Sequence, residues 1–249
     1  MIEVKQLHKR FGRKSVLTGI DFSVNRGESL AIIGKSGSGK SVLLKHLIGL
    51  LKPDSGEVWF DGKLVNKMSF RELQNIRSKV GMVFQFGALF DSMSVSENIS
   101  LALKKLTKLN NHQISERIHK SLIDVGLVDT KDLMPSELSG GMKKRVGLAR
   151  AIAIQPEFLF YDEPTTGLDP IMTDIINRLI IKFQMDKEIT SIIVTHEMRT
   201  VKDVSDRVIM LHDGEIHFDG SPTEIQNSKD IYVRQFITGD STLKQKEKV

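Results

Sequence analysis

The sequence predicts an α/β protein whose core is a parallel sheet, with an antiparallel β region near the N-terminus and an inserted helical region. The first observation is a glycine-rich octet at residues 34–41, between a short apolar run and a segment with helical apolar spacing. The second is a stretch from about residue 86 to 155 in which the strong patterns are helical. The third is the alternation of β-rich and helical segments after it, which is typical of a parallel sheet.

The N-terminal third is expected to consist mainly of strands. Residues 2–7 and 16–24 show partial period-two alternation, which predicts antiparallel strands. Residues 28–33 form a short apolar run, as expected for a buried strand. Residues 56–62 predict a strand that ends in a tight Asp-Gly turn, and residues 80–84 predict another strand.

The middle of the chain is expected to be helical. Residues 94–105, 114–125 and 142–154 have apolar spacing that fits amphipathic helices. Because strands are predicted on both sides of this stretch, we expect a helical subdomain at about residues 86–155, inserted into the α/β core.

The remaining segments predict the rest of the sheet. Residues 158–161 and 191–194 are β-rich, and the segment 170–187 between them has the length of a helix. Residues 208–211 and 215–218 read as a closing hairpin around an Asp-Gly turn. We expect one domain over residues 1–240. The tail, residues 241–249 with a basic run at 244–248, is expected to be disordered.

Composition excludes several kinds of function. The 36 basic and 31 acidic residues give a net charge of +5, and outside the tail the basic residues are scattered, which argues against a nucleic-acid partner. The absence of cysteine excludes disulfides and cysteine-based catalysis, and it fits a reducing cytoplasm. No apolar run approaches the roughly 20 residues that span a bilayer, and the N-terminus has no signal-peptide pattern.

The octet Gly-Lys-Ser-Gly-Ser-Gly-Lys-Ser matches G-x-x-x-x-G-K-[ST], a loop that binds nucleotide phosphates. Its glycines can adopt positive φ, so that consecutive N–H groups point at one anion. Lys40 is expected to reach the β- and γ-phosphates, and the Ser41 hydroxyl to ligate Mg²⁺. The alternative is a flexible linker, but linkers do not usually place a Lys-Ser pair between a buried strand and an apolar helix. The ATP ligands expected here are Gly34, Lys35, Ser36, Gly37, Ser38, Gly39, Lys40, Ser41 and Val42.

Two carboxylates follow the apolar strand at residues 158–161. At the end of a strand beside the phosphate loop, Asp162 can hold Mg²⁺, directly or through water. Glu163 can then align and deprotonate an attacking water molecule. An acidic turn without function is the alternative, and it is disfavoured because the phosphate loop is present in the same chain.

Together with these residues, several further motifs resemble those of ATP-binding subunits of ABC transporters, over nearly the whole chain. The most specific is Leu138-Ser-Gly-Gly-Met142, which is similar to the ABC signature. Taken singly, each motif has a structural alternative: a surface glutamine, a strand-capping histidine, a packed phenylalanine or a helix N-cap. Their order and spacing favour the functional interpretation. The other matches are Gln85 with the Q-loop, residues 167–170 with the D-loop, His196 with the switch histidine, and Phe11 with the aromatic that stacks on adenine.

The resemblance implies a P-loop NTPase fold with a RecA-like parallel sheet core, an antiparallel β subdomain and an inserted α-helical subdomain. It also implies ATP hydrolysis in a head-to-tail homodimer, with Glu163, His196 and Lys40 as the catalytic residues. His196 would sense the γ-phosphate, and Gln85 would join Ser41 and Asp162 at the metal and report its presence to a membrane partner. The partner protomer would complete each site in trans through Ser139, Gly140, Gly141 and Asp169.

Departures from the commonest motifs point to a subgroup. Met142 replaces a glutamine, Val42 a threonine and Phe11 a tyrosine. Residues 85–93 and 138–146 resemble the ATPases of Mla-type transporters, which move phospholipid between inner and outer membranes and maintain outer-membrane lipid asymmetry. This resemblance implies a position on the cytoplasmic face of the inner membrane, with an integral-membrane permease of the MlaE type, an MCE-domain protein of the MlaD type and a small STAS-domain subunit of the MlaB type.

Two other functions remain open. An importer ATPase for a small polar solute such as an amino acid would use the same chemistry with a different permease. A non-transport ABC ATPase is the less favoured reading, since this chain has one ATPase domain and no room for a long coiled coil between Lys40 and Leu138. The segment after Gln85 is expected to distinguish the candidate transporters, because the resemblance places it at the surface that faces the permease. Its apolar residues Phe86, Leu89, Phe90 and Met93 are expected to contact the permease or to fill the local core.

Overall fold

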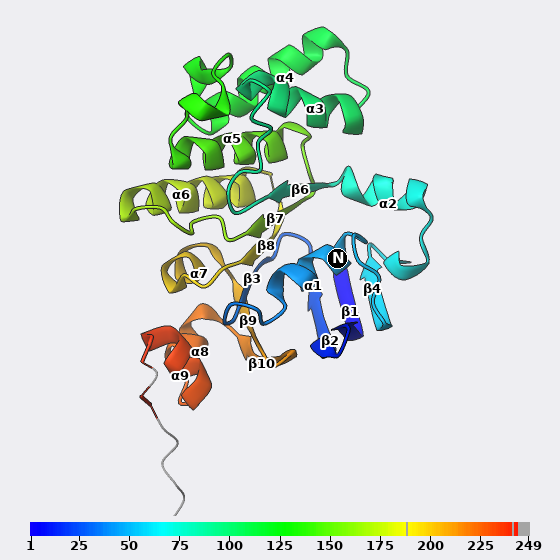
Figure 1. The fold of residues 1–249 in the computed structure, drawn as a ribbon, viewed down its shortest axis with the longest axis vertical. Helices are drawn as coiled ribbons and strands as arrows, with labels where there is room; N and C mark the ends of the chain where they lie inside the picture. Colours follow the sequence, from blue (N-terminus) through cyan, green and yellow to red (C-terminus); the bar gives the residue numbers. More distant parts are fainter. Residues whose placement is uncertain (188, 241, 244–249) are drawn as a thin grey trace, which may run out of the picture.

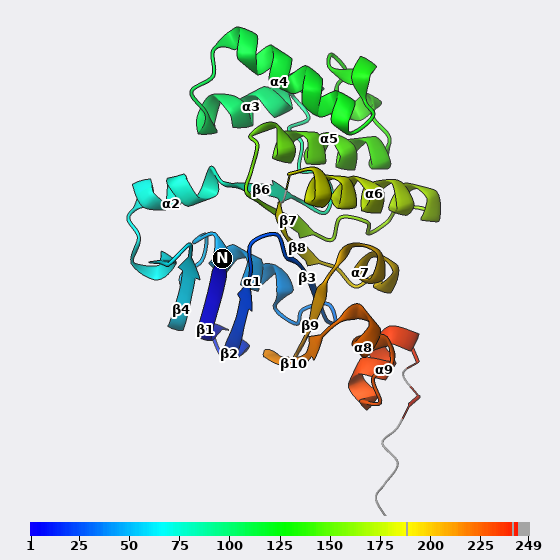
Figure 2. The same ribbon diagram turned by 180° about the vertical axis from the view of Figure 1, so that it is seen from behind.

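The computed structural model describes residues 1–187, 189–240 and 242–243. The predicted disordered tail and its basic run fall mostly on residues 241 and 244–249, which lie outside the described residues. In Figures 1 and 2 a helical lobe occupies one end of the molecule, and two sheets with their covering helices form the rest. This is the α/β architecture expected from the sequence.

The antiparallel sheet contains the N-terminus. Its strands lie in the order β2-β1-β4-β5, and β1 pairs antiparallel with both β2 and β4. The Asp-Gly turn after β4 is confirmed, since Asp61 and Gly62 both have positive φ there. The strand bounds are β1 Ile2–Phe11, β2 Lys14–Val24, β4 Ser55–Phe60 and β5 Lys63–Leu64.

The second sheet has the order β10-β9-β3-β8-β7-β6. Neighbours from β9 to β6 are parallel, and β10 closes the sheet as the antiparallel partner of β9. Every residue of β3 and β8 is buried, as expected for central parallel strands that are covered on both faces. The bounds are β3 Ser29–Ile33, β6 Val80–Val83, β7 Phe158–Asp162, β8 Thr190–Val194, β9 Arg207–His212 and β10 Glu215–Gly220.

The helical lobe is formed by α3 Val95–Leu106, α4 Asn111–Asp124 and α5 Gly140–Ala153 (green in Figure 1). Short 3₁₀ turns, η2 Val128–Thr130 and η3 Pro135–Glu137, connect α4 to α5. Ser94 and Asn110 begin the first two helices with reciprocal capping boxes. The three predicted helices are therefore present, while the boundaries of the inserted subdomain stay a prediction.

The other helices flank the sheets. The predicted helix at residues 170–187 is confirmed as α6, and α1 follows the glycine-rich octet. The short helices α2, α7, α8 and α9 were not predicted, although Ser69-x-x-Glu72 at the start of α2 and Ser221-x-x-Glu224 at the start of α8 are capping-box signals. The bounds are α1 Lys40–Leu47, η1 Val65–Lys67, α2 Phe70–Arg77, α6 Pro170–Lys187, α7 Met198–Val204, α8 Pro222–Gln226 and α9 Ile231–Thr238.

Apolar packing fixes the relation between sheets and lobe. One core cluster joins the antiparallel sheet and α1 to the parallel sheet, through residues such as Leu17, Leu44 and Phe160. A second joins the helical lobe to α6 and the sheet, with Leu148, Phe183 and Ile193 in it. Within the described part of the chain, no helix is both long enough and apolar enough to cross a membrane.

Candidate active site

The phosphate loop connects β3 to α1, as predicted. Gly34 has φ 148°, and a Cβ on it would lie 2.5 Å from Leu211 O and 2.7 Å from Ser38 Oγ. Gly39 precedes α1 with φ 101°, and a Cβ there would lie 2.9 Å from Leu17 Cδ2. Both positions therefore require glycine for conformation and for space. The loop carries its backbone into a helix N-terminus, where an anion is stabilised.

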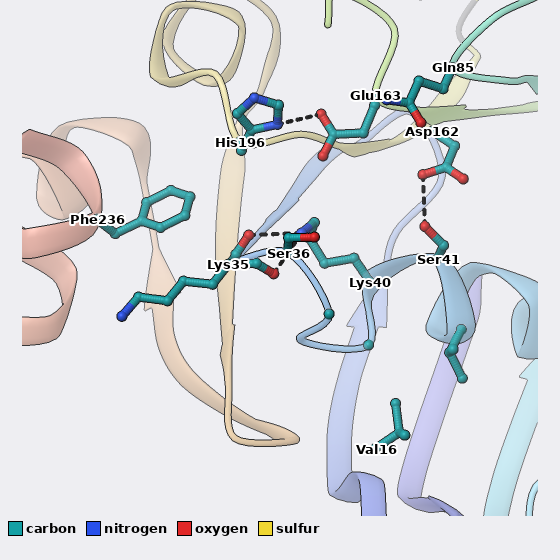
Figure 3. A pocket seen from close by; sticks show the side chains of 14 residues that line it. Val16, Lys35, Ser36, Lys40, Ser41, Gln85, Asp162, Glu163, His196 and Phe236 are labelled. Carbon is teal, nitrogen blue, oxygen red and sulfur yellow. Dashed lines mark hydrogen bonds and ion pairs between the residues drawn. The ribbon is translucent and has the colours of Figure 1, made fainter. Parts of the chain in front are cut away.

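A cavity of about 580 Å³ opens over this loop (Figure 3). It brings together residues from the loop and α1, from the ends of β6 and β7, and from the segment after β8. Most residues predicted to bind ATP or metal therefore lie around one space. The lining residues are Val16, Gly34, Lys35, Ser36, Gly37, Gly39, Lys40, Ser41, Val42, Gln85, Asp162, Glu163, His196 and Phe236.

Lys40 lines the cavity and is largely buried. Its Nζ donates to Gly34 O at 2.7 Å and to Lys35 O at 3.1 Å, so the ammonium group is held inside the loop. Burial lowers the pKa of Lys40 from its ordinary value, and the nearby carboxylates of Glu163 and Asp162 oppose this shift. The cation is thus placed where an anionic ligand of the loop would compensate its loss of hydration.

Ser41 and Asp162 face each other across the cavity. Ser41 Oγ donates to Asp162 Oδ1 at 3.0 Å, although the two residues are 121 positions apart. Burial raises the pKa of Asp162, partly opposed by the Ser41 hydrogen bond. Gln85 lies beside Asp162 (Figure 3). These oxygen-bearing side chains fit Mg²⁺, which prefers oxygen ligands, and a cation would stabilise the buried carboxylate.

Glu163 stands in a left-handed conformation, with φ 52°. Non-glycine residues rarely adopt this conformation, and it persists only where the surroundings enforce it. The backbone N–H of Glu163 donates to Val194 O at 2.8 Å. Its Oε2 lies 2.8 Å from His196 Nδ1 and accepts from Thr166 Oγ1 at 2.8 Å. The carboxylate therefore points into the cavity from a fixed position (Figure 3).

The pairing of Glu163 with His196 was not predicted, because the motif of each residue indicates a separate role. Phe236 was also missed. It reaches the cavity from α9, on the side of the loop away from Ser41 (Figure 3). Val16 lines the same cavity from β2. Neither belongs to a motif, so a single sequence holds no signal for them.

Phe11, predicted to stack on adenine, does not line the cavity in the described structure. Its side chain is 48% exposed, and Lys9 Nζ lies 5.5 Å from its ring centroid. Ser38 is close to the cavity without lining it, and its Oγ is buried without a hydrogen-bond partner among the described residues. The role of Phe11 in stacking stays a prediction.

The residues predicted to act in trans lie outside the lining of this cavity. Ser139 is the N-cap of α5, and its Oγ accepts from Met142 N at 3.3 Å. Asp169 precedes α6 and accepts from Ile171 N and Met172 N at 2.9 Å. Gly140 and Gly141 form the first turn of α5. Within one chain, the two sets of predicted nucleotide contacts are therefore separate.

The segment after Gln85 presents large apolar side chains to solvent. Phe86 is 75% exposed and Phe90 53% exposed, whereas Leu89 is half-buried against the core of the helical lobe. Asn98 of α3 fixes this segment, since it donates to Phe90 O and Met93 O and accepts from Phe90 N. Leu89 therefore packs in the local core, whereas contact of the exposed Phe86 and Phe90 with a permease stays a prediction.

One family model and several known proteins are similar to this chain in sequence. A family model described as "ABC transporter" matches residues 17–166. The chain is 39% identical to the intermembrane phospholipid transport system ATP-binding protein MlaF of Haemophilus influenzae, over 97% of this chain and 91% of that protein. It is 41% identical to protein TRIGALACTOSYLDIACYLGLYCEROL 3 of Arabidopsis thaliana, over 96% and 74%. It is also 41% identical to the methionine import ATP-binding protein MetN of Carboxydothermus hydrogenoformans, over 90% and 67%.

Solved structures of ATP-binding cassettes are similar to this chain in fold. A dimeric ATP-binding cassette in a post-hydrolysis state, bound to ADP and Pi, superposes with a TM-score of 0.83 at 31% sequence identity. The match covers 89% of this chain and 99% of that one. The similarity therefore extends to the arrangement of sheets and helical lobe.

Proposed function

The chain belongs to the ABC transporter family and is an ATPase of that family, and from this premise we propose that it powers phospholipid transport between the inner and outer membranes of a cell envelope. The observation that carries the lipid assignment is the similarity to MlaF, which spans nearly all of both chains. The resemblance of residues 85–93 and 138–146 to Mla-type ATPases supports it.

We infer the binding roles from the cavity. Lys40 and the N–H groups of the phosphate loop would hold the outer phosphates of ATP. Ser41, Asp162 and Gln85 would hold Mg²⁺, which neutralises charge on the phosphate oxygens when bound. Phe11 remains the proposed contact of the adenine base. The ligand set proposed from the phosphate loop is the one expected from the sequence, from Gly34 to Val42.

The proton transfer is assigned to Glu163. With Oε2 held at 2.8 Å by both His196 and Thr166, the other carboxylate oxygen, Oε1, would accept the proton of a water molecule that attacks the γ-phosphate. His196 would fix the orientation of this carboxylate and contact the γ-phosphate from the same side. A carboxylate held by two hydrogen bonds has a restricted orientation, which suits a group that acts as a base.

We propose a head-to-tail homodimer with two composite sites. Ser139, Gly140 and Gly141 at the N-terminus of α5, with Asp169, would complete the site of the partner protomer, where a helix N-terminus favours phosphate. Two facts support this arrangement: these residues lie away from the cavity of their own chain, and the similar solved cassette is a dimer with ADP and Pi.

The membrane partner would dock on the exposed segment that contains Phe86 and Phe90. Large apolar side chains on a protein surface usually mark a contact with another protein. On this proposal the dimer sits on the cytoplasmic face of an inner membrane, beneath a permease of the MlaE type. An MCE-domain protein and a small STAS-domain subunit would complete the complex.

A second candidate function is the import of a small polar solute. The 41% identity to a methionine import ATPase favours it, and the ATPase chemistry would be unchanged. The two functions differ in the permease, since the residues around the cavity serve either transporter.

Purification of the chain from native membranes, followed by mass spectrometry of the accompanying subunits, tests the proposal. We expect a permease together with MCE-domain and STAS-domain proteins, and ATP-dependent phospholipid transfer after reconstitution into vesicles. The same complex carrying Glu163→Gln is the control and should transfer no lipid. Recovery of an amino-acid permease, with methionine uptake and no lipid transfer, would replace the lipid assignment by the second candidate.

A further inference from the structure

Lys144 is a buried lysine within the stretch 138–146 that resembles Mla-type ATPases. It lies in the second turn of α5, five residues after Ser139, and its side chain is 5% exposed. Its Nζ donates to three backbone carbonyls, those of Thr166 at 2.7 Å, Pro164 at 2.9 Å and Glu163 at 3.4 Å. An ammonium group has three protons, and this arrangement uses all of them on one loop.

The loop that Lys144 holds carries the proposed catalytic base. Thr166 receives the shortest hydrogen bond of Lys144 at its carbonyl, and its own hydroxyl donates to Glu163 Oε2. A continuous path of two hydrogen bonds therefore joins Lys144 to the carboxylate of Glu163. The left-handed conformation of Glu163 has to be enforced by its surroundings, and the bond from Lys144 to Glu163 O acts directly on that residue.

The loop at residues 163–166 is also hydrogen-bonded to β8 and α7. Val194 at the end of β8 accepts from Glu163 N, and Thr200 of α7 is hydrogen-bonded to Thr165. Lys144 adds a tie from α5, the helix whose N-terminus is proposed to meet the nucleotide of the partner protomer. Burial lowers the pKa of Lys144, while the carboxylates of Glu197 and Glu163 oppose this effect. These two carboxylates therefore favour the charged form of the buried lysine.

We propose that Lys144 is a positioning residue that links the signature helix α5 to the catalytic carboxylate of Glu163 in the same chain. When the partner protomer and its nucleotide fix the start of α5, Lys144 fixes residues 163–166 in the geometry for proton transfer. Each chain then connects the two composite sites of a dimer. The start of α5 contacts the nucleotide bound to the partner protomer, and Lys144 positions Glu163 in the site of its own chain. This inference rests on the proposed function, because it takes Glu163 as the base.

The first experiment uses Lys144→Met in the full-length chain, in the complex that co-purifies with it. Methionine keeps an unbranched side chain and removes the ammonium donors. We expect kcat for ATP hydrolysis to fall at least tenfold, with KM and the Kd for ATP within twofold of wild type. Lys120→Met, which removes an exposed lysine from α4, is the matched control and should leave kcat unchanged.

A second measurement asks whether Lys144 acts through Glu163. Lys144→Met is combined with Glu163→Gln, and single-turnover hydrolysis of labelled ATP is compared across the four proteins. We expect the double variant to be no slower than Glu163→Gln within a factor of two, because the positioned group is already absent. A further tenfold loss would mean that the two residues act independently and would overturn the inference.

Chemical rescue keeps the test decisive if Lys144→Met folds poorly. The chain has no cysteine, so Lys144→Cys introduces a single thiol that can be alkylated in mild denaturant before refolding. Aminoethylation restores an ammonium group at nearly the original length, while ethylation gives a neutral side chain. We expect the aminoethylated protein to recover at least a third of wild-type kcat and the ethylated protein to stay at least tenfold below it.

Several results would contradict the inference. These are a Lys144→Met variant with kcat within twofold of wild type, a loss carried by weaker ATP binding, and equal turnover of the two alkylated proteins. Failure of the proposed function looks different. If Glu163→Gln alone keeps near-normal turnover, Glu163 is not the base, whatever Lys144 does.

Discussion

At the residue scale, the site consists of charged and polar groups, and two of its key hydrogen bonds join residues that are remote in sequence. Glu163 is held by His196 and Thr166 at 2.8 Å each, and Ser41 is hydrogen-bonded to Asp162 at 3.0 Å. Hydrogen bonds of this kind align a reacting group before the substrate arrives.

Glu163→Gln should bind ATP and fail to hydrolyse it. The amide keeps the size of the side chain but cannot accept the proton, so we expect kcat to fall by about 10²-fold or more. Steady-state ATPase assays and equilibrium binding of labelled ATP measure the two effects. Glu116→Gln, on the exposed side of α4, is the control and should match wild type. A loss of less than about tenfold, roughly 1.4 kcal/mol of barrier, would exclude Glu163 as the base.

Asp162→Asn should stabilise the nucleotide-free protein at neutral pH. Burial raises the pKa of Asp162 in the folded state, so its ionised form destabilises the fold. This cost is absent below the unfolded-state pKa of about 3.9, grows as the pH rises, and is complete above the folded-state pKa. We therefore expect a higher melting temperature for the variant at about pH 7.5, a gain that disappears toward about pH 4.

Melting curves with ATP and Mg²⁺ complete this test. The cation should favour the wild-type carboxylate, so the ligand-induced rise in melting temperature should be larger for wild type than for Asp162→Asn. Identical melting temperatures of the two nucleotide-free proteins at neutral pH would show that burial of this carboxylate carries no cost.

At the element scale, α5 connects three parts of the protein. Its N-cap Ser139 lies at the surface proposed to meet the partner, Lys144 holds the loop at residues 163–166, and Arg150 donates to Gly87 O and Ala88 O at 2.7 Å. Gly147 of α5 packs directly against Gly87, since a Cβ on Gly147 would lie 3.0 Å from the Cα of Gly87. A displacement of α5 would therefore affect both the base and the segment after Gln85.

Ser139→Arg should abolish hydrolysis while a single protomer still binds ATP. The cap hydrogen bond is lost at a cost of about 1 kcal/mol, but the larger effect is a bulky side chain where the nucleotide of the partner should fit. ATP-dependent dimerisation, measured by light scattering, should disappear. Ser69→Arg removes the equivalent N-cap of α2 and should leave dimerisation intact. A Ser139→Arg protein that still dimerises on ATP would contradict the composite site.

At the scale of the whole molecule, the helical lobe and the sheets place the apolar segment after Gln85 at the surface. Leu89 is anchored in the core of the lobe, while Phe86 and Phe90 extend into solvent. Asn98 holds the backbone of Phe90 through its N–H and its carbonyl, which do not depend on the side chain at that position. A substitution there should change the surface and leave the fold unchanged.

Phe90→Asp should uncouple ATP hydrolysis from transport. We expect the melting temperature within about 2 °C of wild type, because a half-exposed side chain contributes little to the core, together with normal ATP binding. Co-purification of the membrane subunit and lipid transfer should each fall at least about tenfold, that is by about 1.4 kcal/mol. Met185→Asp, at an exposed position of α6, is the control. An unfolded Phe90→Asp protein, or one that retains the permease and transports lipid, would refute the assignment.

Local structure and the chemistry of the motifs could be predicted from the amino-acid sequence. The strands other than the two-residue β5, the longer helices and the phosphate loop were predicted. Each depends on near neighbours in the chain: on period-two or helical apolar spacing, or on glycines at positive φ before a helix N-terminus. The short helix α2 was missed although its capping box was visible. The capping box that begins α8 was overlooked as well. Helices as short as α7, α8 and α9 are marginal alone, so tertiary packing largely supports them.

Tertiary structure alone decided which of these groups meet. The strand order β10-β9-β3-β8-β7-β6 places the ends of β3, β7 and β8 side by side, and this brings Ser41 to Asp162 and Glu163 to His196. It also brought Phe236 to the cavity, left Phe11 outside its lining and put Lys144 under the catalytic loop. The physical reason is that contacts between residues far apart in the chain depend on how the sheet and helices pack around the core, which no local pattern of residues specifies.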